Sequence, residues 1–182
     1  MPSTWRCLAG VRKCRFREQS ASHGFAEPPG TLLRPAVLVL AVGNPSRGDD
    51  AIGPELAARI EATTLPGVEV LVEFQLQVEN ALDLVGRERV IFIDAGVDTP
   101  APFELRRIEA APEFLHTSHA LSPEAVLATY ERLHGAPVPE SWVLCVRGES
   151  FELGEPLSGV AAAHLEAAWT ALGRWLGLEF QP

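Results

Sequence analysis

The sequence predicts one α/β domain, a three-layer α/β/α sandwich around a five-stranded, mostly parallel, twisted sheet. Continuous apolar runs such as residues 37–42 are typical of strands that are buried on both faces. These runs alternate with helical segments, and a β-α-β-α-β order implies parallel pairing with helices on both faces. A length of 182 residues and a hydrophobic content of 47% suit one domain with a sizeable core.

The first half of the domain contains four expected strands. Residues 37–42 form the first strand, and Ile52, Leu56 and Ile60 lie at helical spacing in residues 51–62. The next elements are a second strand at residues 68–74, a short helix at 78–85, a third strand at 90–93 and a fourth strand at 103–108. The fourth has the partial alternation of an edge strand, and we expect one strand of the sheet to be able to run antiparallel.

The second half of the domain contains two helices and the fifth strand. A helix is expected at residues 122–134, because Ser122 suits the N-cap, Pro123 suits the first helical position and Glu124 suits the first turn. The fifth strand is expected at residues 142–146, and a long helix with an apolar stripe at residues 159–176.

Charge separates residues 1–34 from the rest of the chain. Residues 1–34 hold six basic and two acidic residues, whereas residues 35–182 hold nine basic and 22 acidic residues. We expect residues 1–34 to be an N-terminal extension, either disordered or the product of a start codon assigned too early, and residues 35–182 to be the single domain. The arginine-rich extension also resembles a transit peptide, but it lacks the apolar segment of a secretory signal.

Composition excludes several classes of function. The acidic domain disfavours nucleic-acid binding, which depends on neutralising phosphates. No apolar run approaches the ~18–20 residues that cross a bilayer, so we expect no membrane segment. Three cysteines without a C-x-x-C motif fit a reducing, cytoplasmic compartment, and Cys145 lies in an apolar strand pattern typical of the core.

The loop after the first strand has the glycine spacing of a phosphate-binding loop but the wrong charge. Gly43 and Gly48 are followed by Asp49 and Asp50, where a phosphate loop would have Lys and Ser or Thr. Two carboxylates repel phosphate, so we expect no nucleotide cofactor. They suit a metal ion or proton transfer, and the alternative is that one of the two caps the following helix.

Two further residues extend this potential site. Asp94 follows the apolar run of the third strand, and ligands of such sheets bind at the carboxyl ends of strands, where we expect it to lie near Asp50. The alternative is a solvated turn residue. His116 and His119 precede the second-half helix, and one loop histidine with two carboxylates is a plausible ligand set for a divalent transition metal.

Three segments resemble the [NiFe]-hydrogenase maturation proteases. Residues 43–53, GNPSRGDDAIG, resemble the G-N-x-x-x-x-D-[DE]-x-x-G opening of that family. The tripeptide at residues 93–95, IDA, resembles its strand-end aspartate, and residues 117–121, TSHAL, resemble its His-x-Leu loop. The likeness covers most of residues 36–176 and leaves out the N-terminal extension.

The resemblance implies a phosphorylase/hydrolase-like fold and an endopeptidase that removes a C-terminal extension from the hydrogenase large-subunit precursor after nickel insertion. It implies that Asp50, Asp94 and His119 contact nickel, which the precursor supplies, and makes them the candidate catalytic residues. Asp49 is then a supporting carboxylate or the helix cap. Position 50 is Glu in some members, so the shorter Asp has less reach.

Other interpretations stay open at this point. Residues 74–80 and the Pro-Ser-Arg loop resemble the branch that serves bidirectional, NAD-coupled hydrogenases. Gln75 and Glu79 would line the cleft in that case, or simply begin a surface helix. A non-catalytic chaperone that binds nickel or the precursor would use the same scaffold, and a nucleoside-handling enzyme would need a phosphate site that the two acids oppose.

Overall fold

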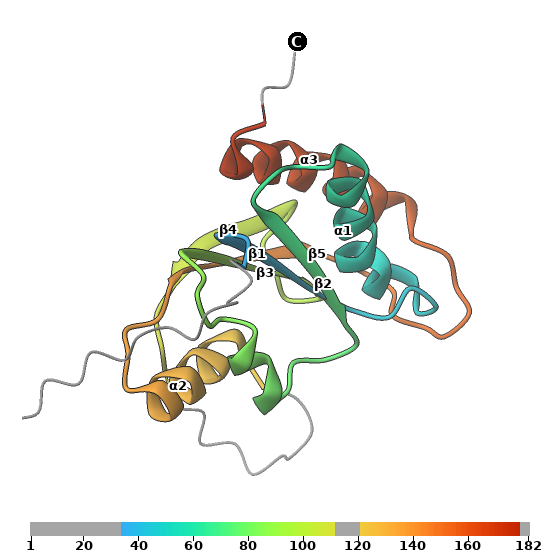
Figure 1. The fold of residues 1–182 in the computed structure, drawn as a ribbon. Helices are drawn as coiled ribbons and strands as arrows, with labels where there is room; N and C mark the ends of the chain where they lie inside the picture. The colour runs from blue at the N-terminus through green and yellow to red at the C-terminus, as the bar shows by residue number, and fades with distance from the viewer. Residues whose placement is uncertain (1–33, 112–120, 179–182) are drawn as a thin grey trace, which may run out of the picture. The chain divides into compact units, whose positions relative to one another are not determined.

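The computed structural model describes residues 34–111 and 121–178, which contain a five-stranded sheet of order β2-β1-β3-β5-β4 (Figure 1). The strands are β1 (Val37–Val42), β2 (Val68–Glu73), β3 (Arg89–Gly96), β4 (Phe103–Ile108) and β5 (Glu140–Arg147). The first three and β5 run parallel, and β4 pairs antiparallel with β5 at one edge. The predicted five-stranded, mostly parallel sheet is confirmed, and the structure identifies the antiparallel strand as β4.

Helices cover both faces of the sheet, as the sandwich prediction requires. On one face, α1 (Ile52–Thr63) and α3 (Gly159–Leu176) pack over Val39, Ile91 and Leu144. On the other face, α2 (Pro123–His134) and the 3₁₀ turn η2 (Val78–Leu82) pack over Leu40 and Phe92. Figure 1 shows these layers above and below the sheet. None of the helices in the described residues is long and apolar enough to cross a membrane.

Local sequence signals define the helix ends. The hydroxyls of Ser122 and Ser158 accept hydrogen bonds from the third residue of α2 and α3, respectively, which is the N-cap geometry. Gly135 and Gly177 adopt the left-handed conformation that ends these two helices. The predicted bounds of both helices are therefore accurate.

The predicted helix at residues 78–85 is wrong in type and length. The structure has a 3₁₀ turn that ends at Leu82, preceded by a reciprocal hydrogen-bond pair between Gln77 and Asn80. The Asn80 side chain accepts from the Gln77 backbone N–H and donates to Asp83, so it holds a single turn instead of continuing a helix. The first helix also differs, because a 3₁₀ turn, η1 (Gly48–Ala51), precedes α1.

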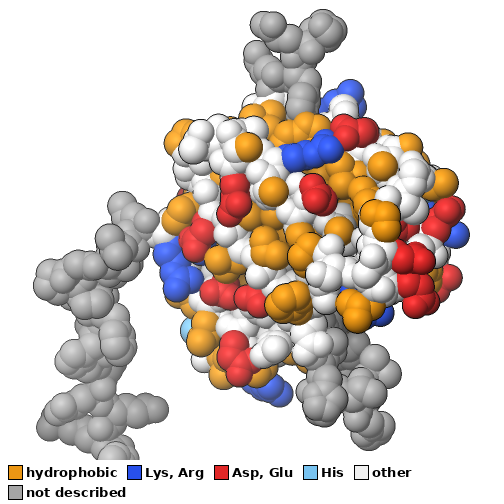
Figure 2. All heavy atoms as spheres, turned by 90° about the vertical axis from the view of Figure 1, so that its right-hand side faces the viewer, with side chains coloured by type: hydrophobic (Ala, Val, Ile, Leu, Met, Phe, Trp, Pro, Cys, Tyr) orange, Lys and Arg blue, Asp and Glu red, His pale blue; other side chains and the backbone are white. Residues whose placement is uncertain are grey.

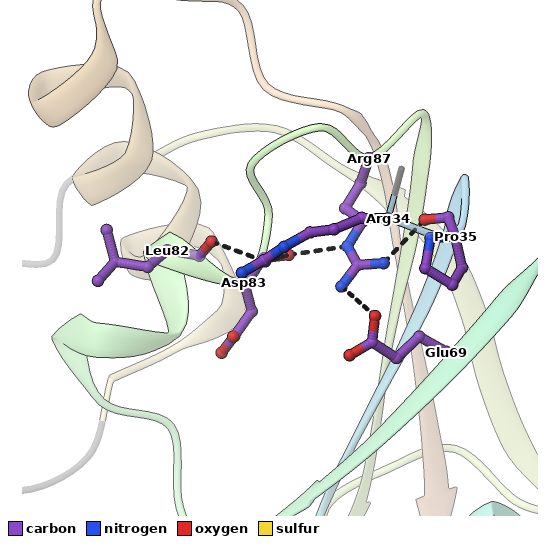
Figure 3. A network of polar contacts seen from close by, with 6 residues as sticks. All are labelled: Arg34, Pro35, Glu69, Leu82, Asp83 and Arg87. Atoms are coloured by element: carbon purple, nitrogen blue, oxygen red, sulfur yellow. Dashed lines mark hydrogen bonds and ion pairs between the residues drawn. The ribbon is translucent and has the colours of Figure 1, made fainter. Parts of the chain in front are cut away.

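A buried arginine ties the amino ends of three strands together (Figure 3). The Arg87 side chain is completely buried and donates to the carbonyls of Asp83 (2.9 Å) and Pro35 (2.8 Å) and to Glu69 Oε2 (2.6 Å). Pro35 precedes β1, Glu69 lies in β2 and Arg87 precedes β3. Since a buried guanidinium needs all of its partners, this contact fixes the amino edge of the sheet.

We expect Arg87→Met to lower the free energy of unfolding by about 2–4 kcal/mol, because it leaves the carbonyls of Asp83 and Pro35 and the Glu69 carboxylate without their donor. Arg132→Met, at an exposed position on α2, is the matched control and should change stability by less than about 0.5 kcal/mol. Urea unfolding of both variants measures the difference. Equal stability of the two would show that the network contributes nothing.

Candidate functional site

Two glycines bring the start of α1 against the carboxyl end of β1. A Cβ on Gly43, whose φ is +142°, would lie 2.0 Å from the carbonyl oxygen of Asp50. A Cβ on Gly53 would lie 2.2 Å from the carbonyl oxygen of Val42. Only glycine allows such close backbone approach, so these residues fix Asp50 beside the end of the strand.

Asp50 lies partly buried on this rim, which we define as the carboxyl ends of β1, β3 and β5 with the loops that follow them. Its Oδ2 accepts a hydrogen bond from the Asn44 backbone N–H at 2.9 Å. The Asn44 side chain in turn accepts from the Ser46 N–H at 2.9 Å. The loop backbone therefore orients the Asp50 carboxylate from one side.

Asp94 lies inside β3, which extends to Gly96, and pairs with Cys145 of β5. The interpretation as a solvated turn residue is therefore wrong. Burial raises the pKa of Asp94 to about 6, the Ala95 N–H bonded to its Oδ1 (2.8 Å) lowers it, and the nearby charge of Asp50 raises it. The structure thus brings Asp50 and Asp94 to the same rim, close enough to repel each other.

The third predicted ligand, His119, lies outside the described residues, as does His116. Within residues 34–111 and 121–178, no group of three or more His, Cys, Asp or Glu side chains is arranged to hold a metal ion. The carboxylate pair is therefore the part of the expected ligand set that the structure describes, and the metal assignment stays a prediction.

Asp49 does not cap a helix, so the cap, one of the two roles predicted for it, is wrong. The N-caps of η1 and α1 are Arg47 and Ala51, and neither makes a side-chain capping bond. Asp49 is instead fully buried and accepts four hydrogen bonds from the segment after β5. The donors are the N–H groups of Glu149 (2.7 Å), Ser150 (3.0 Å) and Ser158 (2.7 Å) and the Ser158 hydroxyl (3.0 Å).

These four donors determine the charge state of Asp49. Burial alone raises the pKa of this carboxyl, but the N–H groups and the hydroxyl outweigh it and hold the pKa below its ordinary value. Asp49 is therefore ionised at neutral pH. Since Ser158 also caps α3 through Ala161, the carboxylate connects the loop after β1 to the start of the last helix.

Backbone contacts continue the connection between the two loops. Asp49 N–H donates to the Ser150 carbonyl at 2.7 Å, and Gly154 N–H donates to the Ser46 carbonyl at 2.7 Å. The Arg47 guanidinium donates to the Phe151 carbonyl at 3.2 and 3.3 Å. Sequence reasoning missed this second loop, residues 148–158, because it carries no motif of its own and lies about a hundred residues away.

Both loops lie on the right of Figure 1 and face the viewer in Figure 2, where hydrophobic and acidic side chains are interspersed.

Cys145 adds no nucleophile to this rim. It is partly buried, its Sγ lies 2.9 Å from Thr99 Oγ1, and burial raises the pKa of its thiol. A thiol with a raised pKa stays protonated at neutral pH.

Several solved structures with this fold are named hydrogenase maturation proteases or peptidases. The endopeptidase HybD from Escherichia coli is 28% identical, with a TM-score of 0.61, and the match covers 79% of this chain and 94% of that one. The hydrogenase 2 maturation peptidase from a Thaumarchaeota archaeon is 25% identical, with a TM-score of 0.57 and coverage of 79% and 99%. HycI from Thermococcus kodakarensis, at 19% identity and a TM-score of 0.60, shares the fold over 79% of this chain and 93% of that one.

No protein-family model matches the sequence, and neither does the sequence of any curated protein. The fold is that of the hydrogenase maturation proteases, and its match to HybD supports the resemblance found in the sequence. HybD and the Thaumarchaeota protein are peptidases by name, which bears out the expectation of an enzyme of the peptidase class.

Asp49→Asn is expected to lower the free energy of unfolding by about 2–4 kcal/mol, because an amide offers one acceptor oxygen where four donors converge. Hydrogen exchange should become faster at the amides of residues 149–158. Glu152→Gln, on the exposed part of the same loop, is the control and should leave exchange unchanged. Unaltered protection in the Asp49 variant would contradict the anchoring role.

Asp94 predicts a specific pH dependence of stability. The pKa of Asp94 is raised from 3.8 to about 6 in the folded state, so the folded state binds the proton more tightly than the unfolded state does. Stability therefore falls as the pH rises from about 3.8 to about 6. Asp94→Asn removes this loss, so its stability relative to wild type should increase by about 1–3 kcal/mol from the acidic to the neutral side. Urea titrations across the window measure it. A stability difference between wild type and Asp94→Asn that does not change with pH would contradict the raised pKa of Asp94.

Proposed function

We propose that this protein is an endopeptidase that removes the C-terminal extension of a [NiFe]-hydrogenase large-subunit precursor after nickel insertion. The observation that carries the proposal is the Asp50–Asp94 pair on the rim of a fold shared with named maturation peptidases. The reaction would take place in the cytoplasm. The precursor of a bidirectional, NAD-coupled hydrogenase is the substrate that residues 74–80 favour.

The nickel ion belongs to the substrate, and the acidic rim is suited to recognise it. Two neighbouring carboxylates repel each other until a cation lies between them, so a precursor that carries nickel binds better than an empty one. Oxygen ligands from Asp50 and Asp94 with an imidazole from His119 would leave coordination positions open for substrate.

Asp94 is the residue best suited to exchange a proton. With a pKa of about 6 it is largely ionised at neutral pH and still binds a proton readily, as a general base requires. Asp49, fully bonded and buried, positions the rim and takes no proton. Nickel would either polarise the scissile carbonyl or serve for recognition alone, and Asp94→Asn separates these roles by its effects on cleavage and on binding.

Mass spectrometry of the nickel-loaded precursor tests the activity. Incubation with the wild-type protein should release one C-terminal fragment, while Asp50→Asn and Asp94→Asn should reduce the rate at least about a hundredfold, in line with loss of a general base. Asp98→Asn, an exposed acid just after β3, is the matched control and should cleave normally. Precursor binding without loss of mass would favour the non-catalytic chaperone, and normal cleavage by both site variants would refute the site.

A further inference from the structure

The strand β2 forms an open edge of the sheet. It is the first strand in the order β2-β1-β3-β5-β4, and no strand among the described residues pairs with its outer side. Edge strands usually carry Lys, Pro or a bulge that prevents further pairing. The β2 sequence, VEVLVE, contains neither Lys nor Pro.

The direction of the backbone groups can be derived from the β1–β2 contacts. Val37 N–H donates to the Gly67 carbonyl at 3.1 Å, and Gly43 N–H donates to the Glu73 carbonyl at 2.9 Å. In a parallel ladder, alternate residues bond to the same neighbour, so the odd-numbered residues of β2 face β1. The N–H and C=O groups of Val70 and Val72 therefore point outward, where a further strand could pair with them.

Exposed apolar side chains are frequent in the stretch of chain from the end of β2 through η2. Five of the nine exposed large hydrophobic side chains in the described chain lie within residues 72–85. They are Val72 (48%), Phe74 (73%), Val78 (48%), Leu82 (52%) and Val85 (39%), and we call them the β2–η2 strip. Gln75 and Glu79 are exposed among them. The strip begins at the end of β2, next to the rim.

The charge of the strip selects the kind of partner. Residues 68–86 contain four acids, namely Glu69, Glu73, Glu79 and Asp83, and no Lys or Arg. Arg87 pairs with Glu69, and Arg34 donates to the carbonyls of Leu82 and Asp83, so the acidic part of the strip is its start, at Glu73 and Glu79. A second copy of the chain would bring an identical acidic strip against this one, which opposes association. An apolar segment with basic residues complements both the exposed side chains and the carboxylates.

We propose that the outer edge of β2 and the β2–η2 strip bind an extended, apolar and basic segment of the protein substrate as an added strand. The inference rests on the proposed function and names where the substrate docks. Backbone hydrogen bonds to Val70 and Val72 give affinity, and the exposed side chains of the strip give specificity.

The geometry also fixes how far the docked segment lies from the carboxylates. An added strand is three strand spacings from β3, or about 14 Å, and an extended chain covers that distance in about four or five residues. The scissile bond is therefore separated from the docked segment by about that number of residues. Moving it further away should slow cleavage without weakening binding.

Three variants test the docking site. Val72→Pro removes an outward N–H without breaking a β1–β2 bond, and Phe74→Lys and Glu79→Lys introduce like charge toward a basic partner. Leu133→Lys is the matched control, because Leu133 is an exposed apolar residue at the C-terminal end of α2, outside the strip. Thermal unfolding should be close to wild type for the lysine variants, which keeps the test valid if Val72→Pro fails to fold.

The probe is a nickel-loaded hydrogenase large-subunit precursor. Its cleavage is followed by mass spectrometry, and its binding is measured by surface plasmon resonance. We expect the Kd and the KM of the folded variants to rise about tenfold while kcat changes less than about twofold. Wild-type Kd and KM in all folded variants would overturn the docking site. A protein dimer that Val72→Pro converts to monomers would also overturn it, because the occupant would then be a second copy.

The two proposals fail in different ways. Binding that depends on the β2–η2 strip without any cleavage would refute the peptidase and retain the docking site. Cleavage by the wild type with no effect of Val72→Pro or Phe74→Lys would retain the peptidase and refute the docking site.

Discussion

The rim depends on one buried carboxylate. Asp49 has no exposed surface, and its two oxygens accept four hydrogen bonds from three residues of the segment after β5. A buried charge is tolerated only where its donors are fixed, because loss of any one leaves it uncompensated. The same carboxylate therefore positions the loop of residues 148–158, the first turn of α3 through Ser158, and its own neighbour Asp50.

Two consecutive acids have different tasks because of the turn that holds them. In the 3₁₀ turn η1, successive side chains point about 120° apart, so Asp49 faces the interior while Asp50 faces the rim. Gly48 makes this arrangement possible: its φ is +55°, and a Cβ there would lie 2.6 Å from the Ser150 carbonyl oxygen. The amino edge of the sheet is held separately by Arg87, so both ends of the strands are fixed by a buried charge with several partners.

The strands and long helices could be predicted from the sequence because their signals are local. Apolar runs mark β1 and β3, and Ser122 and Ser158 begin helices by bonding to residues three positions away. The role of Asp49 could not be predicted from the sequence, because its donors lie about a hundred residues further along the chain and only the fold brings them together. The prediction of a short helix after β2 was wrong for a local reason, because the Asn80 side chain accepts the Gln77 N–H and closes a single turn. The carboxylate pair was predicted from strand ends, and the contribution of His119 stays a prediction.

The proximity of Asp50 and Asp94 has a consequence for the stability that this fold can attain. Like charges placed together in a partly buried site are a form of local frustration, because the charge of Asp50 disfavours ionisation of Asp94. Substitutions that relieve the conflict would make the free protein more robust and the rim less attractive to a cation. Sequence change at these two positions is thus constrained by a trade-off, in which the domain retains an unfavourable contact that only a bound positive charge resolves.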